Sequence, residues 1–325
     1  MDAAESVVLK PSPAVLVSPA LARPPASLWR DAWRRLVRNK PAVVSMILIG
    51  LLVLVAVFAQ SLAPYSYEQQ DLDHPDEGPS AGHIFGTDNL GRDMFSRLLY
   101  GSRISLAVAL VDILIVLLVG VPLGLFAGYL GKWFDALIMR AIDILYAFPA
   151  LLLIIVVITY LRAVLDLPQA GLLAGVGAVD KLTGGLLGVF VALALVSWLT
   201  VARLVRGQVL SLKQKEFIEA ARTVGAGRQR IMFAHLLPNV MAPIIISATF
   251  GIPGAIANEA GLSFLGLGVR PPLPSWGILI SDGVQSMRTY PHELIFPGGV
   301  LAITLICFNF LGDGLRDALD PKTRQ

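Results

Sequence analysis

Residues 42 to 62 read AVVSMILIGLLVLVAVFAQSL, a run of 21 residues without one charged side chain. As an α-helix rising about 1.5 Å per residue, a run of this length extends for roughly 30 Å, the thickness of the hydrocarbon core of a bilayer. A cleaved secretory signal is the alternative, but the apolar part of such a signal usually covers only about 7–15 residues. We therefore expect a first membrane-spanning helix here, with Pro41 in its first turn.

Further apolar runs follow along the chain and predict additional spans, at 104–128, 136–160, 186–205, 241–268 and 294–312. The composition agrees, because only 15% of the residues are charged, against about 25% in a typical soluble domain. The stretch 163–185 also contains apolar residues, but its charges and glycines favour a loop with a short helix. The sequence thus predicts an all-α, polytopic membrane protein with six transmembrane helices.

The positions of the basic residues predict the orientation of these helices. Lys and Arg collect before the first span, in the long loop between the fourth and fifth spans, and in the C-terminal tail. The other side holds the minority of the 26 basic residues, namely Arg92, Arg97, Arg103, Arg162, Lys181, Arg270 and Arg288. Because cytoplasmic loops are enriched in Lys and Arg, both termini are expected in the cytoplasm. The net charge of +3 therefore requires no nucleic-acid partner.

The remaining segments complete the expected organisation of the chain. Residues 1–27 are rich in proline and predict a disordered cytoplasmic tail. Within 28–62, an amphipathic segment with two tryptophans precedes the first span and favours a helix in the headgroup plane, the alternative being an ordinary solvated helix start. An extracytoplasmic loop at 63–103, a core of the other five spans at 104–313 and a cytoplasmic tail at 314–325 follow.

The longest cytoplasmic loop contains a short segment suited to docking. Residues 216–224 are mainly good helix formers, and Gly225 is a natural helix stop. The segment offers two large apolar side chains that can insert into a partner's pocket, two small ones that permit close approach, and two charged ones for a polar rim: Phe217, Ile218, Ala220, Ala221, Glu219 and Arg222. The alternative is a solvated amphipathic loop helix.

The stretch Glu219-Ala220-Ala221, followed by Gly225 and then by Leu237-Pro238, resembles the EAA loop of bacterial ABC importer permeases. In that family the loop forms a coupling helix that docks on an ATPase subunit. Two further stretches, FGTDNLGRD at 85–93 and LSFLGLG at 262–268 with the turn up to Gly277, resemble the second permease of the dipeptide, oligopeptide and nickel importer group.

The resemblance implies a type I ABC importer permease fold in the bacterial cytoplasmic (inner) membrane. It implies a homologous permease as heterodimer partner, two ATPase subunits that carry ATP and Mg, and an extracytoplasmic substrate-binding protein. The expected cargo is a di- or oligopeptide; nickel or another small solute is the alternative within the same class. The ATPase-coupling residues carried over are Phe217, Glu219, Ala220, Ala221, Gly225, Leu237 and Pro238.

The stretches that follow the first and fifth spans are rich in Gly, Asn, Asp and Pro, which is typical of turns. Here Asp88, Arg92 and Asp93 can form local ion pairs that fold the outer loop into a cap, and Trp276 belongs to the same outer region. Contact with a substrate-binding protein, or formation of an outer gate, is the equally weighted alternative.

Charged residues within apolar runs are costly unless they are paired or hydrated, so they face the protein or a cavity. Asp143 lies one helical turn from Arg140, and we expect the two to pair. Glu259 lies in a run interrupted by prolines and glycines, which favours a place near the translocation pathway or its gate; a hydrogen bond to a neighbouring helix is the alternative. Asp143 is the second pathway candidate. Gly120, Gly124 and Gly128 predict a face for close helix packing.

Motifs of other functional classes are missing from the sequence. There is no phosphate-binding Gly-x-x-x-x-Gly-Lys-Ser/Thr and no His-Glu-x-x-His, and the single cysteine, Cys307, lies in an apolar run. We therefore expect neither catalysis, nor a cofactor, nor a metal in this chain, and place ATP hydrolysis in partner subunits. A secondary carrier would predict internal repeats, and a membrane-embedded enzyme would predict paired polar residues at one depth; neither pattern is evident.

Overall fold

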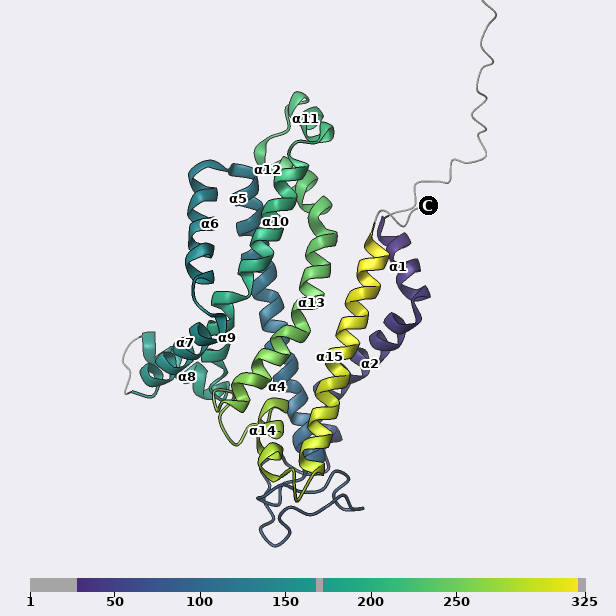
Figure 1. Ribbon diagram of the computed structural model, residues 1–325, viewed down its shortest axis with the longest axis vertical. Helices are drawn as coiled ribbons and strands as arrows, with labels where there is room; N and C mark the ends of the chain where they lie inside the picture. The colour runs from purple at the N-terminus through teal and green to yellow at the C-terminus, as the bar shows by residue number, and fades with distance from the viewer. Residues whose placement is uncertain (1–27, 168–171, 321–325) are drawn as a thin grey trace, which may run out of the picture.

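The computed structural model describes residues 28–167 and 172–320, so the predicted tail 1–27 lies outside the described residues. In chain order the elements are α1 (Leu28–Arg38), α2 (Lys40–Val57), α3 (Ala59–Leu62), α4 (Met94–Ile115), η2 (Val116–Gly120), α5 (Val121–Leu130), α6 (Lys132–Tyr146), α7 (Ala150–Leu165), α8 (Leu172–Leu182), α9 (Leu186–Val196), α10 (Trp198–Leu212), α11 (Glu216–Thr223), α12 (Arg228–Arg230), η3 (Ile231–Leu236), α13 (Leu237–Phe264), α14 (Trp276–Ser286) and α15 (His292–Leu319). Figure 1 shows α11 at one end of the long helices, here named the α11 end, and loop 63–93 at the other, the loop end.

In the described part of the chain, five helices are long and apolar enough to cross a membrane. They are Lys40–Val57, Met94–Leu130, Leu186–Leu212, Arg228–Phe264 and His292–Leu319. The third predicted span is not a straight helix: α6 and α7 meet at 88°, and Pro149 caps the start of α7. A proline cannot continue the hydrogen bonding of a regular helix, which accounts for the break. Counting this bent pair as one span brings the number to six, as predicted.

Two boundaries differ from the prediction. Helix α4 begins at Met94, so the loop at the loop end stops at Asp93 instead of residue 103. The Asp93 carboxylate accepts the backbone N–H of Ser96 at 2.7 Å and thereby caps the helix. The hydropathy of the sequence did not predict the first turns of α4, because they contain charged residues such as Arg97. At the other terminus, α15 continues to Leu319, so residues 314–319 of the predicted tail are helical. The short helix expected in 163–185 is present as α8.

Helix α2 exposes a wide apolar surface, including Val44, Ile47, Leu51 and Leu54, which suits contact with lipid. The preceding α1 buries Ala32 and Leu36 against the C-terminal part of α15 and leaves Trp29 and Trp33 more than half exposed. The amphipathic helix expected at the start of the chain is thus confirmed as a helix, and its place in the headgroup plane stays a prediction.

The glycine face predicted at Gly120, Gly124 and Gly128 packs against α10. A Cβ atom on Gly124 would lie 2.5 Å from the backbone oxygen of Ala202, and one on Gly128 would lie 2.8 Å from the Cβ atom of Val209. Absence of side chains lets the two helix backbones approach closely, as expected of small residues four apart. This contact packs α5 closely against the helix that leads into α11.

Candidate functional site

Helix α11 is a separate short helix whose end is defined by glycine. The N–H of Gly225 donates to the carbonyl of Arg222 at 2.9 Å, and the N–H of Ala226 donates to that of Ala221 at 2.9 Å. This pair of bonds is the Schellman motif, which needs a left-handed residue after the helix, and Gly225 supplies it with φ of +86°. A Cβ atom added at Gly225 would meet no other atom within 4 Å, so the requirement for glycine is conformational.

One residue of α11 anchors the helix and its neighbour is free to contact another protein. Ile218 is fully buried, in an apolar cluster that includes Tyr129 of α5, Val209 of α10 and Met232 of η3. Phe217 is 41% exposed and Val224 is 89% exposed. The expectation that Phe217 and Ile218 both insert into a partner is therefore wrong for Ile218, because its side chain fills a pocket of its own chain.

The other predicted coupling residues surround this anchor. Glu219 and Ala220 are exposed and Ala221 is half-buried. Leu237 is half-buried and packs against the same apolar cluster as Ile218, while Pro238 is exposed in the first turn of α13. The π-helical turn η3 immediately precedes α13, whose Pro238 lacks the N–H that a regular helix would use there. The cluster thus connects α11 mechanically to the long helix α13.

Helix α10 exposes a polar face along its length, in contrast to the apolar surface of α2. Thr200, Arg203, Gly207 and Ser211 are all exposed and follow one another at helical spacing. The first of them lies next to the middle residue of the apolar helix Leu186–Leu212. Polar groups at this depth avoid hydrocarbon, so the face must meet water or another protein.

Two contacts extend this face onto α6. Asp143 forms an ion pair with Arg203, and the guanidinium of Arg203 lies 4.5 Å from the ring centroid of Tyr146. The hydroxyl groups of Tyr146 and Thr200 are hydrogen-bonded at 2.8 Å. The expected pairing of Asp143 with Arg140 is therefore wrong. The partner is Arg203, which the sequence analysis grouped with the basic residues of the long loop. Because Arg203 is 60 residues from Asp143 in the sequence, no local pattern could predict this pair.

Glu259 lies inside the helix bundle. Its carboxylate accepts hydrogen bonds from Ser263 at 2.7 Å and from Ser105 of α4 at 3.1 Å, and its side chain is 1% exposed. The Ser105 hydroxyl also accepts the backbone N–H of Trp276, the first residue of α14. The network joins α4, α13 and α14, which is the hydrogen bonding to a neighbouring helix that the alternative predicted.

At the loop end, the expected pairing of Asp88 with Arg92 is present, whereas Asp93 caps α4 and contacts His83. The Asp88 carboxylate accepts a hydrogen bond from the Nε–H of Arg92 at 2.8 Å and also forms an ion pair with Arg97 of α4. Asp88, Arg92 and Arg97 are each at least nine-tenths buried, so they hold the loop to the helices instead of facing outward. Sequence reasoning missed Arg97 because it was assigned to the loop. Trp276 is fully buried as well, and its indole N–H donates to the Leu98 carbonyl at 3.3 Å.

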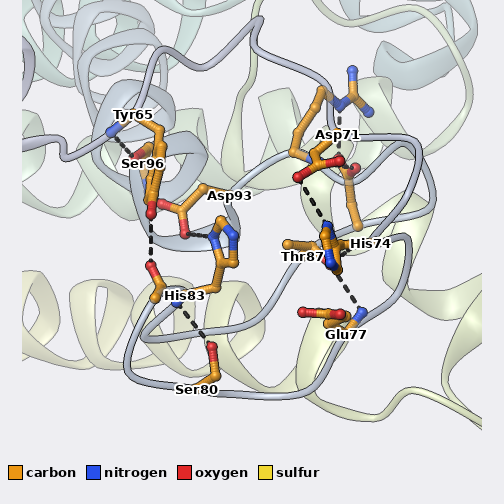
Figure 2. A network of polar contacts seen from close by, with 12 residues as sticks. Tyr65, Asp71, His74, Glu77, Ser80, His83, Thr87, Asp93 and Ser96 are labelled. Carbon is orange, nitrogen blue, oxygen red and sulfur yellow. Dashed lines mark hydrogen bonds and ion pairs between the residues drawn. The ribbon is translucent and has the colours of Figure 1, made fainter.

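The rest of loop 63–93 is held together by a network of polar contacts (Figure 2). His83 bonds Asp93 through Nδ1 at 2.9 Å and stacks on Tyr65. On the exposed side, the His74 imidazole lies 3.0 Å from the Asp71 carboxylate. This hydrogen bond holds the pKa of Asp71 below its ordinary value and raises the pKa of His74 above its own. The loop is thus a folded cap with a titratable outer surface.

Comparison with known families and proteins fits this geometry. Residues 120–325 match the family described as binding-protein-dependent transport system inner membrane component, and residues 27–79 match the N-terminal TM domain of oligopeptide transport permease C. The chain is 42% identical to the oligopeptide transport system permease protein OppC of Bacillus subtilis, over 92% of this chain and 91% of that protein.

Other relatives are named for the transport of different compounds. The chain is 42% identical to the dipeptide transport system permease protein DppC of Alkalihalophilus pseudofirmus, over 92% of this chain and 91% of that one. It is also 42% identical to the glutathione transport system permease protein GsiD of Pectobacterium atrosepticum, over 91% of this chain and 92% of that protein. Among solved structures, the fold resembles an inward-facing MetNI methionine ABC transporter chain, with a TM-score of 0.51, 20% identity, and coverage of 70% of this chain and 98% of that chain.

Proposed function

This chain belongs to the family of binding-protein-dependent transport system inner membrane components, and we propose that it is one of two permease subunits in an ATP-driven peptide importer. It is a multi-pass protein of the inner membrane and a transport permease with the MetI-like fold. ATP hydrolysis, and the binding of ATP and Mg, belong in this proposal to two partner ATPase subunits.

The main structural support for the proposal is α11, which is buried on one face and exposed on the other. Its buried Ile218 fixes the helix to the cluster shared with Leu237, while Phe217, Glu219 and Ala220 stay exposed. A helix anchored on one face and open on the other can transmit a displacement of a docked partner to the long helix α13. The proposal therefore places an ATPase subunit against α11, with the α11 end and both termini in the cytoplasm.

The polar face of α10 supports a second permease as heterodimer partner. Thr200 and Arg203 at membrane depth need a surface other than lipid. A homologous permease facing this one would cover that surface and enclose a hydrated pathway between the two chains. An extracytoplasmic substrate-binding protein would deliver cargo at the loop end.

Peptides are the proposed cargo. The relatives are named for oligopeptide, dipeptide and glutathione transport, and each of these compounds contains peptide bonds. Nickel, the other cargo expected of lookalike importers, is named in none of the relatives described above. We therefore propose a peptide as the substrate, with the substrate-binding protein selecting its length.

The test is the ATPase activity of the assembly, co-purified and reconstituted in lipid, with and without peptide-loaded receptor. Glu219→Ala and Phe217→Ala remove exposed side chains of α11 and should abolish most of the stimulation by the receptor. Glu216→Ala, in the first turn of the same helix, is a control for a general change of the surface. If both variants keep receptor stimulation and ATP-driven uptake, the coupling role of α11 is refuted.

A further inference from the structure

A polar pocket opens in the apolar part of the helix bundle. It has a volume of about 310 Å³, lies between α4, α10 and α13, and is open on one side. Its polar lining consists of Asp112, Ser197, Thr200, Ser247 and Asn258. Asn258 lines this pocket, whereas the adjacent Glu259 points into the buried serine network described above.

The pocket lies at the middle of the long helices that form it. Asp112 is the middle residue of the 37-residue helix Met94–Leu130. Thr200 and Ser247 each directly follow the middle residue of their helices, Leu186–Leu212 and Arg228–Phe264. Three long apolar helices thus contribute polar side chains near their midpoints to one pocket, and a bilayer is least polar near its middle.

Asp112 has no cationic partner in the part of the chain that the structure describes. Its side chain is 5% exposed, and the Ser197 hydroxyl is its hydrogen-bonding partner. Within residues 28–167 and 172–320, no Lys, Arg or His forms an ion pair with it. A carboxylate at this depth requires a positive partner or a proton, because hydrocarbon does not solvate the charge.

The wall opposite Asp112 leaves room for such a partner. Gly251 and Gly254 of α13 line the pocket, and a Cβ atom at either position would meet nothing within 4 Å. Ser247 and Asn258 on the same helix can donate to or accept from a bound amide group. The pocket therefore combines one carboxyl group with neutral hydrogen-bonding groups, which together suit the amino-terminal residue of a peptide.

The pocket also connects with the polar face of α10. Thr200 lines it and is hydrogen-bonded to Tyr146, whose ring lies against Arg203 one helical turn closer to the α11 end. A solute leaving the pocket toward that end would pass along polar groups instead of lipid.

From this geometry we infer that the pocket binds the amino-terminal ammonium group of the transported peptide, with Asp112 as its counter-ion, midway across the membrane. The inference rests on the proposed function, because it takes a peptide as the cargo. The ammonium group supplies the missing positive charge, and Ser247 and Asn258 hydrogen-bond the adjacent peptide group.

The test is equilibrium binding of radiolabelled trialanine and N-acetyl-trialanine to the receptor-free assembly in lipid nanodiscs. The wild type should bind trialanine more tightly, since the acetylated peptide carries no ammonium group. Asp112→Asn keeps the size and the hydrogen bond to Ser197 but removes the charge, and should weaken trialanine binding about tenfold or more. It should leave N-acetyl-trialanine binding nearly unchanged. Asp112→Glu should keep the preference, and Asp317→Asn, an exposed acid of α15, should behave as wild type.

Several outcomes would overturn the inference. Equal weakening for both peptides would indicate a structural role. Unchanged binding in Asp112→Asn would indicate a protonated aspartic acid that needs no cation. Loss of the second permease from the Asp112→Asn assembly would indicate that a cation of that subunit fills the pocket. ATP-driven uptake of trialanine by the wild type is measured in parallel. If uptake is absent while the binding preference is present, the proposed function fails, and only the pairing of Asp112 with a bound ammonium group is retained.

Discussion

Asp143 of α6 forms its salt bridge with Arg203 of α10, and not with Arg140 one turn away on its own helix. The pair joins two helices that are far apart in the sequence and lies on the exposed polar face, with 57% and 44% of the two side chains accessible. Because the cation–π contact of Arg203 with Tyr146 and the hydrogen bond of Tyr146 with Thr200 adjoin it, the pair is part of a continuous polar surface.

A double-mutant cycle on Asp143→Asn and Arg203→Gln should therefore reveal coupling. We expect an interaction free energy of about 0.2–1 kcal/mol, as for other exposed ion pairs. The same cycle with Arg140→Gln should give a value near zero. Thermal unfolding of the purified assembly measures both cycles, and a larger coupling for Arg140 would contradict the geometry.

Ile218 and Phe217 should separate stability from coupling. Ile218→Ala empties a fully buried position and should lower the free energy of unfolding by about 2–5 kcal/mol. Phe217→Ala changes a side chain that is 41% exposed and should alter stability by no more than about 0.5 kcal/mol. It should nevertheless reduce receptor-stimulated ATP hydrolysis. Unfolding midpoints and ATPase rates of the two variants decide the matter; a large loss of stability in Phe217→Ala would show that α11 is held differently.

Gly225→Ala should destabilise the end of α11 without any steric clash. The left-handed backbone at φ of +86° costs a residue with a Cβ atom about 1–2 kcal/mol. Gly227→Ala is the matched control, since its φ of −67° suits any residue and its surroundings are equally open. Hydrogen–deuterium exchange of residues 216–226 should accelerate in the first variant alone. Equal exchange in both would mean that the Schellman turn does not hold the helix end.

Gly124→Ala should disturb the packing of α5 on α10. The added Cβ atom would lie 2.5 Å from the Ala202 carbonyl oxygen and 2.8 Å from the Val205 Cβ atom, and overpacking of this kind typically costs about 1–3 kcal/mol. Gly50→Ala in α2 meets nothing within 4 Å and should stabilise that helix by up to about 1 kcal/mol. Unfolding midpoints of the two variants should move in opposite directions. A neutral Gly124→Ala would imply that the two helices separate easily.

The exposed pair Asp71 and His74 should make loop 63–93 sensitive to pH. The pKa of His74 is raised, so its contribution is complete below the ordinary imidazole value of 6.5 and is lost as the pH rises through the folded value. The pKa of Asp71 is lowered, so its contribution is complete above the ordinary value of 3.8 and is lost as the pH falls through the folded value. Amide exchange in the loop should therefore show its greatest protection, relative to His74→Gln, between pH 3.8 and 6.5. A difference between the two proteins that does not vary with pH would rule out this pair as the cause.

Local features of the chain were enough to predict its class, most of its spans and the short helix at Glu216–Thr223. The uncharged run 42–62 spans a bilayer by length alone, and Gly225 ends α11 through its own backbone preference. The glycines at 120, 124 and 128 repeat at the spacing of one helix face, so their packing role was also predictable. Each of these properties depends on residues within a few helical turns of one another.

Tertiary structure alone decided which groups meet across the bundle. Asp143 has a cation one turn away in sequence but pairs with Arg203, because the packing of α6 on α10 brings that side chain closer. Ile218 and Phe217 are adjacent apolar residues, and only the position of α11 over the Tyr129 cluster makes one an anchor and leaves the other exposed. The environment of Asp112 likewise depends on three helices whose order in space no local pattern contains. The free energy of a charge or an apolar side chain is determined by its neighbours in space, and in this protein those neighbours come from distant parts of the chain.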